Sequence, residues 1–195
     1  MDMQELVRRT RSYRRFQEHH PIPMEVLEGL ADLARLTPSA RNLQPLKYLV
    51  CNDRDWNARI FRELGWAGYL PDWPGPVAGE RPSAHILVLG DRSLTSDFNV
   101  DPGIASQTIV LGACALGLGG CILGSVKREE LKRVLGLPAH LDILLVVALG
   151  KPVEEVRIEP MGPEGNVKYW RDPAGVHHVP KRSLEEVLVR LPAKG

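Results

Sequence analysis

The sequence predicts a mixed α+β fold, because helix-like and strand-like patterns alternate along one chain of 195 residues. The clearest helical pattern covers residues 23–36, and three short apolar runs bounded by turn residues are typical of sheet strands. A chain of this length can bury one sizeable core, so we expect a single domain over residues 1–195.

Three segments carry helix signals. Residues 23–36 begin with Pro23, which suits a first helical turn, and their apolar residues recur at helical spacing. Those residues are Leu27, Leu30, Ala31 and Ala34. Residues 105–120 are apolar around nearly the whole helical circumference before their glycines, which predicts a helix buried in a core or a subunit interface. Ser183 and Glu186 have the spacing of a capping box, so a helix is expected to begin there.

The strand signals are three mostly apolar runs. They read LKYLVC at residues 46–51, AHILVLG at 84–90 and DILLVVALG at 142–150. Mostly apolar runs of this length, bounded by turn residues, predict sheet strands.

Residues 62–83 interrupt this alternation. The segment contains four prolines, four glycines, Trp66, Tyr69 and Trp73, which is too irregular for an ordinary tight connection. Long loops of this kind often serve as lids over a site. Aromatic side chains also fix a loop to the protein surface, so a lid and an anchored excursion both remain open interpretations.

The charge balance excludes several classes of partner. The chain has 25 Lys and Arg against 24 Asp and Glu, a net charge of +1, so we expect no nucleic-acid binding. The five arginines within residues 8–15 therefore favour a compact anion as their ligand. No apolar run approaches the roughly 20 residues of a membrane span, and MDMQELVRR lacks the apolar core of a signal peptide. We expect a cytoplasmic protein without a membrane partner.

Cysteine and histidine patterns argue against a disulfide framework or a metal centre. Cys51, Cys114 and Cys121 lie among apolar neighbours without CxxC spacing, which predicts buried, reduced thiols. His177 and His178 are adjacent, and neighbours in an extended segment point to opposite faces. A metal site needs three or four convergent ligands, so none is expected.

The glycine cluster GLGGCILGS at residues 117–125 does not fit a nucleotide-binding motif. GxGxxG would need glycine where Ile122 stands, and a P-loop would need lysine where Ser125 stands. Its glycines allow either close backbone approach to a flat ligand or close packing of helices. No GxSxG or HExxH pattern occurs, so any chemistry is expected to rest on a bound cofactor.

Four motifs in register resemble the nitroreductase family of flavin enzymes. TRSYRRF (10–16) and PSARNLQP (38–45) are similar to the family's opening signatures. Residues 101–125 are similar to its helix and glycine turn, and VPKRSLEEVL (179–188) to the basic segment before its last helix. The resemblance covers almost the whole chain. It implies a nitroreductase-like α+β fold, with a central, mostly antiparallel sheet flanked by helices, and a homodimer with FMN at the subunit interface.

The activity implied by the resemblance is transfer of a hydride from NADH or NADPH, through FMN, to a small-molecule electron acceptor such as a nitroaromatic, a quinone or a flavin. The resemblance places Arg11 and Ser12 at the phosphate or ribityl chain and Arg14 near the pyrimidine side of the flavin. Lys181 and Arg182 match a second basic cluster at the phosphate. Arginine suits a phosphate because its planar guanidinium donates two parallel hydrogen bonds.

The remaining implied contacts lie at the flavin ring. Pro38 and Ser39 match residues along the isoalloxazine, Asn42 matches a hydrogen-bonding partner of the ring edge, and Gln44 belongs to the same motif. Two further residues, Leu123 and Gly124, match the turn whose backbone approaches the hydride-accepting nitrogen. No catalytic side chain is assigned, since solvent or the flavin's own ring proton could complete the reduction.

The sequence departs from the family pattern in three places. Thr10 stands where the family often has arginine, Leu46 replaces a tryptophan, and Arg41 occupies a position that is often small. The acceptor is therefore not carried over from the resemblance. Arg8, Arg9 and Arg15 match no motif position and are predicted to be surface charges, with a salt bridge at most.

Two alternatives remain open. One is a flavin enzyme of related fold with another task, such as reductive dehalogenation or flavin destruction, which product analysis would recognise. The other is a flavin-binding or anion-binding sensor without turnover, whose yellow chromophore would not be bleached by NADH or NADPH.

Overall fold

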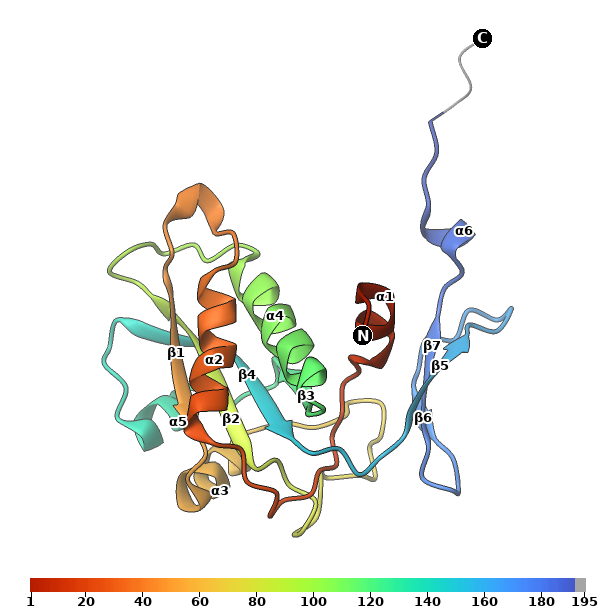
Figure 1. Ribbon diagram of the computed structural model, residues 1–195, viewed down its shortest axis with the longest axis horizontal. Helices are drawn as coiled ribbons and strands as arrows, with labels where there is room; N and C mark the ends of the chain where they lie inside the picture. The colour runs from red at the N-terminus through yellow and green to blue at the C-terminus, as the bar shows by residue number, and fades with distance from the viewer. Residues whose placement is uncertain (192–195) are drawn as a thin grey trace.

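A computed structural model, which describes residues 1–191, shows helices on both faces of a four-stranded antiparallel sheet (Figure 1). The strand order is β1-β2-β4-β3, formed by β1 (Leu46–Cys51), β2 (Ala84–Asp91), β3 (Gly119–Leu123) and β4 (Leu141–Gly150). The predicted α+β class and antiparallel sheet are confirmed. The three predicted strands correspond to β1, β2 and β4, with ends that differ by no more than one residue.

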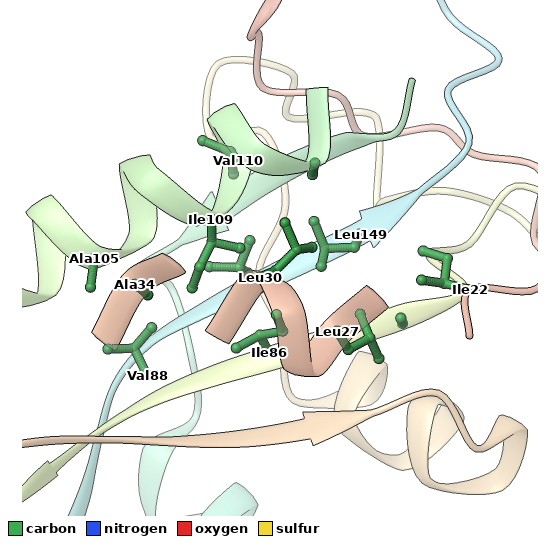
Figure 2. Packing of buried hydrophobic residues seen from close by; sticks show 13 residues of the cluster. Ile22, Leu27, Leu30, Ala34, Ile86, Val88, Ala105, Ile109, Val110 and Leu149 are labelled. Carbon is green, nitrogen blue, oxygen red and sulfur yellow. The ribbon is translucent and has the colours of Figure 1, made fainter. Parts of the chain in front are cut away.

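Two helices, α2 (Met24–Arg35) and α4 (Asp101–Ala115), cover one face of this sheet. Figure 2 shows Leu27 and Leu30 of α2 lying among Ile86 of β2 and Ile109 of α4. All four side chains are fully buried or nearly so. The helices predicted over residues 23–36 and from residue 105 are thereby confirmed, and α4 begins four residues earlier than its apolar run.

The opposite face is covered by α3 (Arg54–Arg62) and α5 (Arg128–Leu135). Successive residues of β2 alternate between the two cores, since Ile86 and Val88 belong to the first and Leu87 and Leu89 to the second. Every residue of β2 is therefore buried, which explains its uninterrupted apolar sequence.

A second, three-stranded sheet follows the first along the chain. It consists of β5 (Val156–Pro160), β6 (Trp170–Arg171) and β7 (His177–Lys181) in the order β5-β7-β6, with β5 and β7 parallel. Figure 1 shows this C-terminal sheet beyond α1 (Met3–Arg9), apart from the main sheet. Beyond β7, α6 (Leu184–Val187) begins with the predicted capping box, in which the Ser183 hydroxyl accepts from the Glu186 amide.

Residues 10–16, here called the N-terminal arm, connect the two sheets. Ser12 bridges to Gly120 of β3, and the Tyr13 amide donates to the Gly120 carbonyl at 3.0 Å. A Cβ atom on Gly119 would lie only 2.7 Å from Cδ2 of Tyr13, so glycine is required where the arm crosses the strand. The glycine cluster predicted as a turn is largely strand, and the turn lies before it, at residues 116–117.

Cys51, Cys114 and Cys121 are free and buried, as predicted. Within residues 1–191, no helix combines the length and apolar character needed to cross a membrane.

Candidate functional site

Four of the predicted site residues line one cavity of about 320 Å³, here called the arm cavity. Arg11, Ser12 and Arg14 come from the N-terminal arm, and Lys181 is the last residue of β7. Helix α4 contributes Gln107 and Val110 to the wall, and β3 contributes Gly120 and Ile122. The structure thus brings together basic residues from opposite ends of the chain.

Strand geometry explains which residues of β7 reach this cavity. His177, Val179 and Lys181 all line it, and they are alternate residues of one strand. Alternate residues of a strand lie on the same face, so His177 and Val179 lie on the face of β7 that carries Lys181. His178 lies between them and instead pairs with Glu159 at 2.7 Å and Asp172 at 3.2 Å, and these two carboxylates raise its pKa.

The arm cavity contains buried donors without partners. Arg11 donates one hydrogen bond to the Val7 carbonyl at 2.7 Å, and Arg14 one to the Ser12 carbonyl at 3.2 Å. However, within residues 1–191 no partner lies near Nε of Arg11, Nε of Arg14 or Nδ1 of His177, and all three atoms are shielded from solvent. Each such donor costs about 1–3 kcal/mol when unsatisfied, so the site suits a ligand rich in acceptor oxygens. A phosphate group, as in FMN, meets that requirement.

Glu154 holds the arm in position. Its carboxylate accepts the backbone N–H groups of Arg14 and Arg15 and pairs with the Arg171 guanidinium at 2.9 Å. The Glu154 side chain is 1% exposed, so this cluster of contacts is buried. Glu154 binds the backbone of Arg14, and the guanidinium of Arg14 forms hydrogen bonds only with neutral groups, the Ser12 carbonyl and the His177 ring, within residues 1–191, so its positive charge is not neutralised inside the cavity.

His177 is the least expected residue of the cavity. It is 1% exposed, and burial, followed by the charges of Arg14 and Arg171, lowers its pKa to about 4. Its Nε2 atom lies 3.2 Å from Nη1 of Arg14. The ring of Tyr169 contacts both residues, with centroid distances of 5.1 Å to the His177 ring and 4.9 Å to Cζ of Arg14.

A second group of predicted residues lies at another cavity, of about 520 Å³, here called the loop cavity. Pro38, Ser39 and Gln44 line it after the end of α2. The Ser39 hydroxyl donates to Asp101 Oδ2 at 2.7 Å and accepts the Gln44 amide at 3.0 Å. These bonds fix the loop to the N-terminus of α4.

The backbone of this loop is unusual. Arg41, Asn42 and Gln44 have positive φ angles of 52°, 55° and 51°, which non-glycine residues seldom adopt. Asn42 lies in the short η1 turn (Ala40–Asn42), with its side chain exposed and its carbonyl accepting from Gln44 Nε2 at 3.2 Å. Strained backbone of this kind is often retained where a loop presents polar groups to a ligand.

The two cavities share no lining residue. Helix α4 runs between them, since Asp101 borders the loop cavity while Gln107 and Val110 border the arm cavity. Six to nine residues of helix correspond to roughly 9–14 Å along its axis. Within one chain, the two groups of predicted residues therefore stay apart.

Four predicted residues line neither cavity: Asn42, whose side chain is exposed, and Leu123, Gly124 and Arg182. The Leu123 side chain is buried in the core beneath α3 and α5, and the Gly124 carbonyl accepts from Arg128 at 3.0 Å. Only their backbone could face a ligand. Arg182 points its guanidinium at Glu186, 3.3 Å away, and is half exposed.

Side-chain contacts hold the segment at residues 62–83 against the rest of the protein. Trp73 packs against the Arg171 guanidinium at 4.7 Å, and the Tyr69 ring lies 5.0 Å from that of Tyr169. Glu80 accepts two hydrogen bonds from Arg15, at 2.7 and 2.5 Å. Arg15 is thus the predicted salt-bridging arginine, while Arg8 and Arg9 are exposed on α1.

The fold is a mixed α+β scaffold with two separate cavities that contain predicted site residues, and comparison with known proteins identifies its family. The sequence pattern of the nitroreductase family matches residues 7–67 and 77–151, so the chain belongs to that family. A relative from Archaeoglobus fulgidus, named "Putative NADH dehydrogenase/NAD(P)H nitroreductase", is 32% identical over 154 residues, covering 75% of this chain and 83% of its own.

Two further proteins are similar to this chain, one in sequence and one in structure. The oxygen-insensitive NADPH nitroreductase of Helicobacter acinonychis is 24% identical over 199 residues, covering 85% of this chain and 95% of its own. The FMN-dependent nitroreductase of Clostridium difficile R20291 superposes with a TM-score of 0.64 at 19% identity, covering 78% of this chain and 89% of its own. At that identity the structural likeness establishes the fold alone.

Proposed function

We propose that this protein is an FMN-dependent oxidoreductase that passes a hydride from NADH or NADPH to a small oxidised acceptor, such as a nitroaromatic, a quinone or a flavin. The observation that carries the proposal is the arm cavity, where Arg11, Ser12, Arg14 and Lys181 converge. Its buried donors without partners favour an anionic ligand. Family membership supplies the reaction class.

A homodimer would complete the site. The arm cavity and the loop cavity are separate within one chain, so we propose that the loop cavity of a second copy lies against the arm cavity of the first. Exposed apolar side chains favour such an association, since large exposed apolar surfaces mark interfaces. Those on α4 and beyond β7 are Ile104, Leu184, Val187, Leu188, Val189 and Leu191.

In this arrangement, Arg11, Ser12 and Lys181 would hold the phosphate end of FMN, and Arg14 would supply a positive charge toward its pyrimidine side. The bound FMN supplies two-electron hydride chemistry that no side chain of the chain can provide. Ser39, held by Asp101, presents the loop that carries Pro38, Asn42 and Gln44 toward the ring. The backbone at Leu123 and Gly124 closes the site, and no side chain is required as an obligatory acid.

An absorption spectrum of the purified protein, before and after anaerobic addition of NADH or NADPH, tests the proposal. The expected result is a yellow protein that releases the mononucleotide on denaturation and is bleached by at least one nicotinamide. A colourless protein that refuses added FMN would contradict it. A chromophore that neither nicotinamide bleaches would favour the sensor, and product analysis with iodinated phenols or with free reduced flavin would separate the related enzymes.

A further inference from the structure

A buried contact in the arm cavity joins two residues 163 positions apart in the sequence. Nη1 of Arg14 lies 3.2 Å from Nε2 of His177. A guanidinium only donates hydrogen bonds, so Nε2 must accept, and the ring proton must then reside on Nδ1. The contact therefore specifies one neutral tautomer of His177.

The surroundings keep this imidazole neutral. Burial is the largest cause of its lowered pKa, and Arg14 from the arm, Arg171 from β6 and His178 from its own strand also disfavour a second proton. Glu154, the nearby carboxylate, is already engaged by Arg171 and by the arm backbone. The lone pair on Nε2 is therefore available to Arg14 throughout the physiological pH range.

We propose that His177 is a positioning residue for the bound flavin: its neutral ring holds the Arg14 guanidinium in the arm cavity while leaving the charge of Arg14 undiminished. A carboxylate at the same place would orient Arg14 equally well but would neutralise it toward an anionic ligand. The Tyr169 ring supports the face of the guanidinium, so Arg14 is restrained from two directions. The consequence for flavin binding rests on the proposed function, whereas the contact itself does not.

The contact is tested first by heteronuclear NMR of the ring nitrogens in the full-length protein as purified. At neutral pH the His177 ring should be neutral with its proton on Nδ1. Arg14→Met should raise the pKa of His177 toward its ordinary value, because a positive neighbour that lowers it is removed. A proton on Nε2, or a His177 pKa unchanged by Arg14→Met, would overturn the proposal.

The consequence is tested by titrating FMN into variants stripped of flavin. His177→Leu keeps a similar volume without an acceptor and should weaken FMN binding about tenfold, as expected for one lost hydrogen bond. His177→Gln offers an amide oxygen and should recover most of this loss. His178→Gln, on the opposite face of β7, is the matched control and should bind FMN like the wild type.

A double-mutant cycle tests whether His177 affects FMN affinity through Arg14. If His177 acts through Arg14, His177→Leu should have no further effect on FMN affinity in an Arg14→Met background. Additive losses, or wild-type affinity in His177→Leu, would refute the positioning role. Failure of the wild type to bind FMN at all would instead refute the proposed function, and the NMR measurements would still decide the contact between His177 and Arg14.

Discussion

Glu154 and Arg171 form a buried ion pair, with Nη2 of Arg171 2.9 Å from Oε2 of a carboxylate that is only 1% exposed. Removing one partner of such a pair leaves the other charge buried without compensation. We expect Glu154→Ala to lower the free energy of unfolding by about 3–5 kcal/mol, measured by urea denaturation. Glu155→Ala is the matched control, because Glu155 pairs with Arg157 at the exposed surface, where such pairs contribute about 1 kcal/mol or less. Equal losses in the two variants would contradict the assignment of Glu154 as the anchor of the arm.

His85 makes the stability depend on pH. Complete burial lowers its pKa to about 3, while Asn57 lies 2.7 Å from its Nδ1 atom. The unfolded chain, with an ordinary histidine pKa near 6.5, gains a proton first as the pH falls, so stability is lost between about pH 6.5 and 3.

The pH effect has a measurable size. Between pH 7.5 and 5, His85 should account for a loss of about 2 kcal/mol in the free energy of unfolding. His177, with a pKa of about 4, acts in the same direction, and His178, with a raised pKa, acts in the opposite direction. Urea denaturation at both pH values should show a smaller loss for His85→Gln. A loss identical to that of the wild type would show that His85 is not held neutral.

Lys181 and Arg182 are expected to contribute differently to FMN affinity, although they are neighbours in one motif. Lys181 lines the arm cavity, whereas Arg182 pairs with Glu186 outside it. Lys181→Ala should weaken FMN binding by about 1.5–3 kcal/mol, the range for a hydrogen bond to a charged group, and Arg182→Ala by less. Fluorescence titration measures both. Riboflavin, which lacks the phosphate, should bind the Lys181→Ala variant as it binds the wild type, and a larger effect of Arg182→Ala would reverse the assignment.

Arg14 should tune the redox potential of the bound flavin. A guanidinium beside the pyrimidine side would meet negative charge that develops only in the reduced ring. If about 1.4 kcal/mol of that attraction is realised, the two-electron potential shifts by roughly 30 mV. Arg14→Met should therefore lower the potential by some tens of millivolts in a dye-linked titration. A potential that stays the same or rises would show that Arg14 does not lie beside the pyrimidine side of the reduced flavin.

Mixed dimers test the composition of the site. Light scattering at low micromolar concentration should give twice the chain mass of 21.7 kDa. Lys181→Ala damages the arm cavity and Ser39→Ala the loop cavity, so unfolding and refolding the two chains together should restore one intact site in each hybrid dimer. Random pairing of equal amounts restores about one quarter of the wild-type sites. If the mixed sample contains no more intact sites than either variant alone, the two cavities that form one site belong to the same chain.

Local patterns were sufficient for three of the four strands of the main sheet and for the helices on its first face, whereas β3 lies in the glycine cluster that was predicted as a turn. Leu27, Leu30 and Ala34 recur at helical spacing, and they are the buried residues of α2. In contrast, α3 and α5 are short and rich in charge, and each buries only one or two side chains, so too few apolar residues mark them as helices. The C-terminal sheet was missed because β6 has two residues and β5 is largely exposed.

The parts of the candidate site that lie within sequence motifs were predictable, whereas the parts that tertiary packing brings together were not. The basic residues of the arm and Lys181 stand in recognisable motifs, but Glu154 and Tyr169 reach Arg14 only through tertiary packing. One signal was available, since the two-residue period of β7 places His177 on the same face as Lys181. The separation of Ser39 from the arm cavity has no local signature, because it depends on where α4 lies.

The arm cavity is enclosed by segments from the two ends of the chain, with Arg14 and His177 separated by 163 positions. During synthesis the N-terminal arm leaves the ribosome long before β7 exists, and contacts so distant in sequence form late in folding. The arginines that line the arm cavity can therefore meet His177, Val179 and Lys181 only after the C-terminal sheet has been synthesised. A chain that ends before β7 would lack the wall of the arm cavity that these three residues form.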